Sequence, residues 1–367
     1  MVSKNKKKIF VGLSGGVDSS VTAALLKDQG YDVVGVFIKT WEPVWLSGEC
    51  SWRQDRRDAM RVSAILRIPF IELDLEKEYK QNIAEYMIRE YREGRTPNPD
   101  VMCNKYIKFG EFLKWSIAHG ADCVATGHYA RLYKKKTNIF LFEGVDVGKD
   151  QSYFLWTLSQ KQLSHIIFPL GDFEKKDVRK LAKKLKLPTF SKKDSQGVCM
   201  LGDISMKEFL AHYISYKTGN VLDTDGNVIG FHEGVFFFTF GERHGFTITS
   251  KGINENPYFV VAKDVDRNTL TVSQTPHSFA LEYPVLFKKI IVSNLNFICE
   301  NICVNDNKNL TCRIRYRGEK KKCKISFCNI KKQIAVIELL ESDATVTSGQ
   351  SLVFYQDKKC LGGGIIV

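Results

Sequence analysis

The first part of the chain alternates short apolar runs with longer stretches of helical periodicity. Strands are expected at Ile9–Leu13, Val33–Ile38 and Phe70–Asp74, with helices at Ser19–Gln29 and Arg53–Leu66 between them. This β-α-β-α-β order predicts an α/β fold with a doubly wound parallel sheet. Such sheets bind ligands beyond the carboxyl ends of their strands, so candidate site residues are sought there.

The pattern of apolar and polar residues changes after this first part. Asp122–Ala125, followed by Thr126-Gly127-His128, repeats the strand-then-glycine pattern, and the lysine-rich stretches Lys175–Leu187 and Lys207–Tyr216 predict a mostly helical connecting module. Farther on, short runs of β-forming residues are separated by Gly, Asn and Asp turns, which predicts a small C-terminal β-barrel. These runs are Val235–Phe240, Tyr258–Ala262, Thr269–Ser273, Leu310–Tyr316, Ile334–Glu338 and Ser351–Tyr355.

Length and composition favour several domains without a membrane anchor. A chain of 367 residues exceeds what one core usually supports, and the expected divisions are 1–165, 166–275 and 276–367. Neither an apolar stretch long enough to span a bilayer nor an export signal at Met1–Lys8 is visible, so we expect a cytoplasmic protein that binds no membrane.

Net charge and cysteine content restrict the classes of partner and metal site that can be expected. The net charge of +13 favours a polyanion such as nucleic acid, although lysines on solvated faces are the alternative. Lys4–Lys8, Lys134–Lys136 and Lys320–Lys322 are assigned to such faces, and the last group lies close to Arg315 in the chain. The ten cysteines include no C-x-x-C pair, which argues against a structural zinc.

The most specific local pattern lies between the first strand and the first helix. Ser14-Gly15-Gly16-Val17-Asp18-Ser19-Ser20 combines two glycines, which allow close backbone approach, with hydroxyl groups and the first N–H groups of a helix. The helix dipole favours an anion at this place, so the run predicts a phosphate-binding loop. It is not a Walker A loop, because no lysine follows the second glycine.

Two cysteines stand beside polar, turn-forming residues. Cys103 follows Pro97-Asn98-Pro99-Asp100, which predicts an exposed thiol at a loop-to-helix junction, with its pKa lowered by the helix N-terminus. Cys199 follows Asp194-Ser195-Gln196-Gly197-Val198. For any single cysteine, a small buried hydrophobe is the alternative interpretation.

The glycine-rich run resembles the PP-loop of the ATP pyrophosphatase superfamily, whose members cleave ATP between the α and β phosphates and adenylate a carbonyl oxygen. The resemblance implies an adenine nucleotide α-hydrolase-like fold, with Ile38 near the adenine, Gly127 beside the nucleotide and Asp18 as a candidate Mg²⁺ ligand. The residues it implies around the ATP phosphates are Gly12, Leu13, Ser14, Gly15, Gly16, Val17, Asp18 and Ser19.

Six further runs, spread over essentially the whole chain, look like the signature segments of bacterial tRNA 2-thiouridylases. They are Arg95–Asn104, Gly127–Arg131, Lys149–Phe154, Phe168–Gly171, Asp194–Cys199 and Leu361–Ile366. The resemblance implies ATP-dependent thiolation at C2 of the wobble uridine in tRNAs for Lys, Glu and Gln. Sulfur would come from a Cys199 persulfide loaded by a sulfur-relay protein, Cys103 would attack that persulfide and leave a Cys103–Cys199 disulfide, and Asp100 would be the acid or base.

The same resemblance implies a tRNA track, and we expect a monomeric enzyme. The middle division would bind tRNA, while its 190–205 stretch returns Cys199 to the active site. A structural histidine is the alternative for His128, and a helix N-cap is the alternative for Asp100. The implied tRNA contacts are Asn98, Pro99, Asp100, His128, Lys149, Asp150, Gln151, Arg315, Tyr316 and Gln350.

One residue departs from the family pattern, and one rival function is retained. Glu242 stands in Gly241-Glu242-Arg243 where the family usually carries a glutamine, and no role is assigned to it. The rival is a PP-loop AMP-forming ligase that amidates a small-molecule carboxylate. It leaves Cys103, Cys199 and the basic C-terminal region unexplained.

Overall fold

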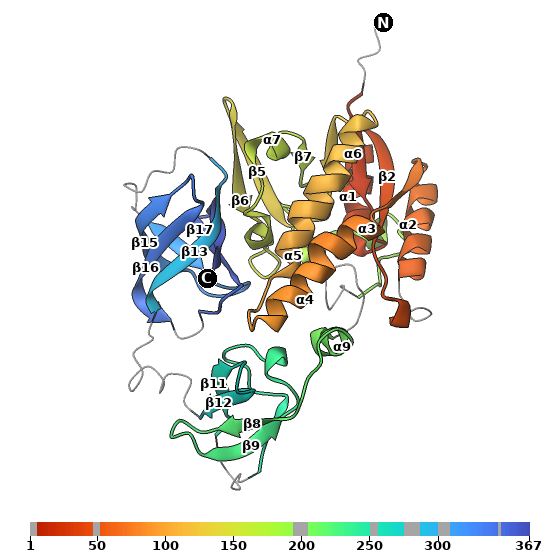
Figure 1. Ribbon diagram of the computed structural model, residues 1–367. Coiled ribbons are helices and arrows are strands. Elements are labelled where there is room, and N and C mark those ends of the chain that lie inside the picture. Colours follow the sequence, from red (N-terminus) through yellow and green to blue (C-terminus); the bar gives the residue numbers. More distant parts are fainter. Residues whose placement is uncertain are drawn as a thin grey trace, which may run out of the picture.

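The computed structural model describes residues 6–46, 52–193, 205–249, 256–274, 287–299, 309–343 and 346–367. Cys199 and the residues before it from Asp194 lie outside these ranges, as does most of the 190–205 stretch. Figure 1 shows an N-terminal α/β part, a β-barrel beside it and a smaller β unit at the far end of α9, Met206–Ala211. None of the helices in the described ranges combines the length and the apolar composition that a membrane span requires.

The N-terminal part contains the predicted parallel sheet. Its strand order is β3-β2-β1-β4-β7, and every neighbouring pair is parallel, with Ile9 of β1 opposite both Val33 of β2 and Cys123 of β4. The doubly wound α/β fold is therefore confirmed. The strands are β1 Lys8–Gly12, β2 Asp32–Lys39, β3 Phe70–Asp74, β4 Cys123–Ala125 and β7 Ile166–Ile167.

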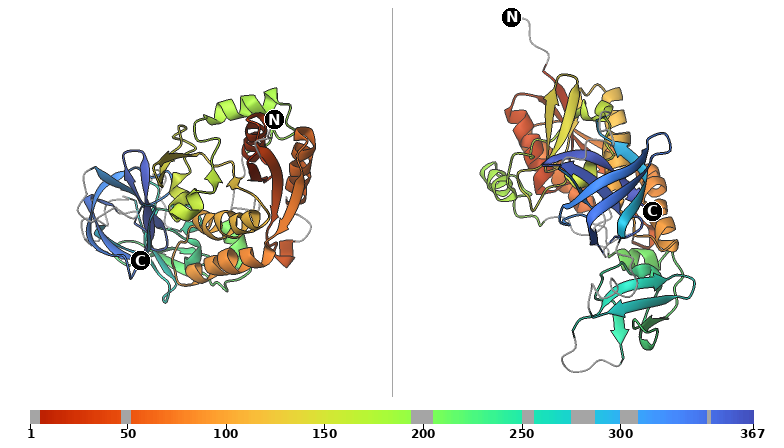
Figure 2. Two further views of the ribbon diagram at one scale, coloured as in Figure 1. Left: turned by 90° about the horizontal axis from the view of Figure 1, so that it is seen from above. Right: turned by 90° about the vertical axis from the view of Figure 1, so that its left-hand side faces the viewer.

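Alternation along β1 explains why helices cover both faces of this sheet. Ile9 and Val11 join a core cluster with residues of α1 and α2, while Phe10 joins the opposite cluster with Phe112 of α6. Figure 2 shows helices on both sides of the sheet. The remaining helices of this part are α1 Val17–Asp28, α2 Trp52–Leu66, α3 Glu76–Tyr79, α4 Glu85–Arg92, α5 Pro99–Met102, α6 Phe112–Ala118, α7 Gln160–Leu163 and α8 Lys175–Lys184, with π-helical turns at Lys80–Ala84 and Cys103–Glu111.

The small unit after α9 is a five-stranded sheet of order β10-β9-β8-β12-β11. The expected strand Val235–Phe240 is wrong: Val235–Phe237 forms a 3₁₀ turn, in which residues three positions apart lie on one side, and the buried Val235 and Phe238 both join the core of this unit. The expected helix Lys207–Tyr216 ends early, at Ala211. The strands are β8 Gly219–Leu222, β9 Val228–His232, β10 Phe246–Ile248, β11 Phe259–Asp264 and β12 Thr269–Ser273.

The C-terminal part confirms the predicted barrel. Six strands pair in the order β13-β16-β15-β14-β17-β18, and β13 also pairs with β18, which closes the sheet around an apolar core. They are β13 Phe287–Phe297, β14 Leu310–Arg313, β15 Lys321–Asn329, β16 Ile334–Asp343, β17 Ser351–Gln356 and β18 Lys359–Ile366.

A hairpin from the N-terminal part extends this barrel. β5, Ala130–Lys135, pairs with β6, Asn138–Glu143, and Phe142 of β6 lies opposite Lys359 of β18. The sequence pattern indicated no strand here. Because the hairpin follows β4 directly, it joins the barrel to the end of the parallel sheet.

Buried charges reinforce that joint. Arg313 of β14 places Nη1 2.9 Å from Asp150 Oδ2 and Nη2 3.0 Å from Glu143 Oε1. Lys320 places Nζ 2.8 Å from the same Glu143 oxygen, so its assignment to a solvated face is wrong. The sequence could not indicate this ion pair, because the partner carboxylate belongs to β6, which is distant in the chain.

Candidate functional site

The glycine-rich run forms the turn between β1 and α1, as the sequence predicts. Gly16 is the N-cap of α1 and supplies no side chain to the first helical turn, so the hydroxyl groups nearby come from serines. Ser19 Oγ accepts from Ser14 N at 3.2 Å, and Ser20 Oγ donates to the Gly16 carbonyl at 2.7 Å. The result is an ordered loop whose backbone N–H groups border a helix N-terminus, the geometry that binds phosphate.

Two glycines let other elements approach this loop closely. Gly15 has φ +73°, and a Cβ there would lie 2.3 Å from the Asp55 carbonyl oxygen of α2. A Cβ at Gly127, beyond the end of β4, would lie 2.8 Å from Asp18 Cβ. Side chains are therefore excluded at both positions, and the ends of β1 and β4 meet at the expected ligand-binding edge. Ile38 lies near the end of β2 and is partly buried.

Asp18, the candidate Mg²⁺ ligand, is already paired. Its two carboxylate oxygens lie 2.7 and 2.8 Å from Lys175 Nζ of α8, and Tyr129 Oη donates to it at 2.8 Å. The carboxylate chemistry suits Mg²⁺, and Asp18 Oδ2, which accepts from Lys175 but not from Tyr129, keeps a lone pair that could coordinate the ion.

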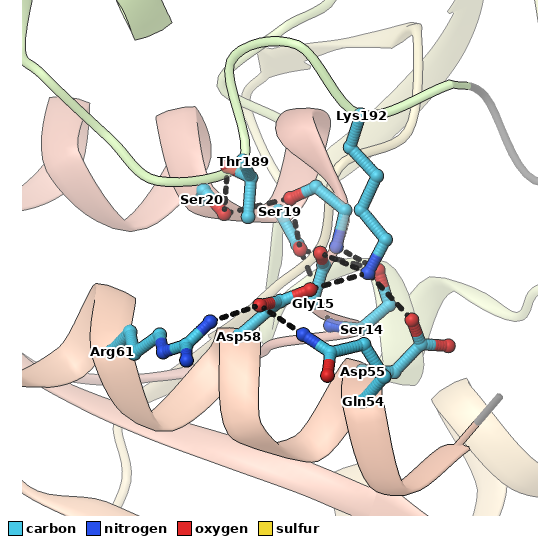
Figure 3. A network of polar contacts seen from close by, with 11 residues as sticks. Ser14, Gly15, Ser19, Ser20, Gln54, Asp55, Asp58, Arg61, Thr189 and Lys192 are labelled. Atoms are coloured by element: carbon cyan, nitrogen blue, oxygen red, sulfur yellow. Dashed lines mark hydrogen bonds and ion pairs between the residues drawn. The ribbon is translucent and has the colours of Figure 1, made fainter.

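A lysine that the sequence reasoning did not single out lies against the loop. Lys192 Nζ is 3.1 Å from the Gly15 carbonyl oxygen, 2.6 Å from Asp55 Oδ1 and 2.8 Å from Asp58 Oδ2 (Figure 3). Burial lowers the pKa of Lys192, but the hydrogen bonds to Asp55 and Asp58 outweigh it, and the pKa is raised overall. Lys192 therefore stays protonated. No local pattern marks it, because its partners belong to the glycine-rich loop and to α2.

Cys103 corrects one expectation. It was predicted to be exposed, yet its side chain is 0% exposed and belongs to the main core cluster. The reason is that α5 continues directly into the π-helical turn Cys103–Glu111, so Cys103 lies within a continuous helical segment that packs against the sheet domain. Its distance from Cys199, which lies outside the described residues, stays a prediction.

The start of α5 settles the alternative for Asp100. Asn98 is the N-cap, with its side-chain oxygen accepting from Val101 N at 3.2 Å, and Pro99 occupies the first helical turn. The N-cap interpretation of Asp100 is therefore wrong. Asp100 lies in the first turn and is partly buried, in reach of the helix dipole.

His128 lies at the end of β4 and is enclosed. Its Nδ1 is 2.7 Å from Thr126 Oγ1, and its ring packs against Phe109 and Phe168, with ring centroids 5.6 and 5.8 Å away. Burial, and secondarily Lys108, lowers the pKa of His128 well below its usual value, so the ring is neutral at physiological pH.

The run Lys149–Gln151 is divided between surface and interior. Asp150 is 3% exposed and accepts from Gly144 N, Ser152 N and Arg313, which makes it part of the barrel joint and leaves it little surface for tRNA. Gln151 Oε1 accepts from Tyr129 N at 3.0 Å. Lys149 lies in the turn before them and is partly buried.

Barrel residues reach the α5 turn. Gln350 Nε2 donates to the Thr96 carbonyl oxygen at 3.0 Å, and Thr96 N donates to the Ser348 carbonyl oxygen at 2.9 Å. The structure thus brings Gln350 near the Asn98–Asp100 run. Arg315 is exposed, while Tyr316 packs on Phe154 with ring centroids 4.3 Å apart.

Glu242 lies where the small β unit meets α4. Its carboxylate accepts from Thr239 N at 3.0 Å, and burial raises its pKa. The neighbouring Lys263 donates to the Phe238 carbonyl oxygen at 3.0 Å, and burial, partly offset by Glu242, lowers its pKa to about 8. A partly buried acid and a partly buried base therefore lie close enough for each charge to shift the pKa of the other group.

Family models match the three parts of the chain. The model described as "tRNA methyl transferase HUP domain" matches residues 7–203, "tRNA methyl transferase PRC-barrel domain" matches 207–274, and "Aminomethyltransferase beta-barrel domain" matches 287–366. Fold and loop together thus define a nucleotide-binding α/β protein of the HUP class with two appended β units.

Curated relatives identify the family within that class. A protein of Bacillus pumilus named tRNA-specific 2-thiouridylase MnmA is 43% identical over 98% of this chain and 94% of its own length. A protein of the same name from Enterococcus faecalis is 42% identical over 100% of this chain and 96% of its own length. The chain belongs to the tRNA-specific 2-thiouridylase family, a family of tRNA sulfurtransferases.

One solved structure with a partial likeness is a 4-thiouridine synthetase–RNA complex with bound ATP. It has a TM-score of 0.34 and 20% identity over 55% of this chain and 47% of that chain. A likeness at this level carries no argument about function. The name of the family models refers to a methyl transferase, but the relatives that match over nearly their full length are named 2-thiouridylases, and the family is assigned from them.

Proposed function

We propose that this chain thiolates C2 of the wobble uridine in tRNAs for Lys, Glu and Gln, and converts ATP to AMP and pyrophosphate in doing so. The observation that carries the proposal is the near-full-length identity with tRNA-specific 2-thiouridylases, in a chain whose phosphate-type loop is complete. The net charge of +13 suits a tRNA partner.

ATP is the first substrate of the proposed reaction. The loop Gly12–Ser19 would hold its phosphates through N–H groups and serine hydroxyls, with Ile38 and Gly127 beside the rest of the nucleotide. The geometric support is the uncapped first turn of α1 and the exclusion of side chains at Gly15 and Gly127. Mg²⁺ would neutralise phosphate charge, and Asp18 has the oxygen ligands for it.

Adenylation serves to make the C2 oxygen of uridine a leaving group. The terminal sulfur of a Cys199 persulfide then attacks C2, and AMP departs with the oxygen. Cys103 attacks the Cys199 sulfur, the persulfide S–S bond breaks, and its electron pair remains with the sulfur on C2. A Cys103–Cys199 disulfide results, and a thiol reductant reopens it. Asp100 would move the proton that Cys103 loses.

The buried position of Cys103 supports a reaction screened from bulk water. The substrate base would have to leave the anticodon stack to reach this depth. The anticodon arm of the tRNA would be contacted by Asn98, Pro99, Asp100 and Gln350 near the active site and by Arg315 and Tyr316 on the barrel. A sulfur-relay protein would load Cys199, and the enzyme would act in the cytoplasm as a monomer.

The decisive experiment is mass spectrometry of tRNA nucleosides after incubation with unmodified tRNA, Mg-ATP and a persulfide donor. Wild type should form 2-thiouridine and AMP, and Cys103→Ser and Cys199→Ser should form no 2-thiouridine. Cys328→Ser, a partly buried barrel cysteine, is the matched control and should retain activity. AMP without a thiolated nucleoside in wild type would instead support the small-molecule ligase.

A further inference from the structure

We infer that Lys192 is a positioning residue for the phosphate-binding loop, acting through the peptide that joins Gly15 to Gly16. The inference rests on the proposed binding of ATP at this loop. It concerns a residue for which neither the loop pattern nor the family's cysteine runs indicates a role.

The contacts of Lys192 explain why it positions the loop and does not itself bind phosphate. An ammonium group has three N–H donors. In this structure they have three acceptors, the Gly15 carbonyl, Asp55 Oδ1 and Asp58 Oδ2, all within 3.1 Å of Nζ. No donor is left over for a ligand, so the effect of Lys192 must pass through its partners.

The first effect is on the direction of an N–H group. A trans peptide is planar, with its C=O and N–H pointing in opposite directions. Lys192 holds the Gly15 carbonyl on the side of α2, so the Gly16 N–H must point the other way. That way lies the hydroxyl cluster of the loop, where Ser14 Oγ accepts from Gly16 N at a long 3.4 Å. A phosphate oxygen would take this N–H at shorter range.

The second effect is on charge. Asp55 and Asp58 lie in the first turns of α2, beside the loop that should receive a triphosphate. Without Lys192, Asp55 would lose its ion pair with that residue and Asp58 would be left with Arg61, so the net negative charge beside the loop would rise and repel the phosphates. Lys192 cancels part of that charge while holding both carboxylates in place.

The segment that carries Lys192 is itself fixed at two points. Thr189 Oγ1 donates to Ser20 Oγ of α1 at 3.1 Å, and Arg179 Nη1 donates to the Lys192 carbonyl oxygen at 3.1 Å. These two contacts fix the backbone that carries Lys192. The side chain is therefore already positioned at the loop before a ligand binds.

The test compares ligands with and without phosphates by isothermal titration calorimetry. Lys192→Met should weaken Mg-ATP binding by about tenfold, the loss of roughly one charge-assisted hydrogen bond, and leave adenosine binding unchanged. Lys192→Arg keeps the positive charge but cannot reproduce the geometry of the three contacts. Its affinity for Mg-ATP should lie between those of wild type and Lys192→Met. The neighbouring exposed Lys193→Met is the matched control and should bind like wild type.

Unchanged ATP affinity in Lys192→Met would overturn the inference, as would an equal loss for ATP and adenosine, which indicates general collapse of the site. Should Lys192→Met fail to fold, Lys192→Arg alone must show a loss for ATP that adenosine does not share. If wild type binds no ATP, the proposed function fails, and that result is distinct from either outcome.

Discussion

Asp150 Oδ2 and Arg313 Nη1 lie 2.9 Å apart, although 163 positions separate them in the chain. The pair joins the segment after the β5–β6 hairpin to a barrel strand, and both side chains are largely buried. Removing one partner of such a pair leaves the other charge buried and without compensation, which destabilises the folded state.

Arg313→Leu should therefore lower the free energy of unfolding by about 3 to 5 kcal/mol, because Asp150 loses the cation it is paired with and Glu143 is left with Lys320. Chemical denaturation followed by circular dichroism measures the change. Arg315→Leu, two positions on and exposed, is the control and should lie within about 0.5 kcal/mol of wild type. Equal stability of Arg313→Leu and wild type would contradict the role given to this joint.

Gly127→Ala tests the approach of β4 to the loop. The added Cβ would lie 2.8 Å from Asp18 Cβ and 2.9 Å from Ser19 N, so the loop must shift away from its phosphate-binding form. We expect ATP affinity to fall by about tenfold or more, on the scale of one lost ligand hydrogen bond. In Gly148→Ala the nearest atom would lie 3.4 Å away, and ATP affinity should be retained. Normal ATP binding by Gly127→Ala would show that the loop tolerates the displacement.

Asn98 offers a way to separate a helix cap from a tRNA contact. Asn98→Ala should cost about 1 kcal/mol of stability through loss of the cap on α5, whereas Asn98→Asp keeps a capping oxygen and should cost much less. If Asn98 also uses its amide donors on tRNA, both variants should raise the KM for tRNA. A KM that changes only in Asn98→Ala would leave capping as the sole role.

Lys263 predicts a pH dependence of stability. Its pKa is lowered from 10.5 to about 8 in the folded protein, so between these values the unfolded chain binds more protons and stability rises with pH. The free energy of unfolding of wild type, relative to Lys263→Met, should increase by up to about 3 kcal/mol from pH 7 to pH 10.5.

Lys183→Met, which changes an exposed lysine on α8, should show no such pH-dependent difference from wild type. A flat difference between wild type and Lys263→Met over the same range would mean that Lys263 is solvated in solution. Urea denaturation at a series of pH values provides the measurement.

Local patterns were sufficient to predict the parallel sheet, the phosphate-type loop and the barrel. β1, α1 and β2 are adjacent in the chain, and their apolar spacing and the glycines at Gly15 and Gly16 follow from backbone geometry alone. Strand β12, Thr269–Ser273, has the predicted bounds for the same reason. The resemblance to a family added the candidate site residues, which no periodicity could supply.

Other features depend on which segments meet in space. The burial of Cys103 follows from the continuation of α5 into a π-helical turn packed on the sheet, and the enclosure of Asp150 follows from Arg313 on a distant barrel strand. The contact of Lys192 with Gly15 joins residues 177 positions apart. Burial and ion pairing are properties of neighbours, and for these three residues the neighbours come from other elements, so only the folded chain could assign them.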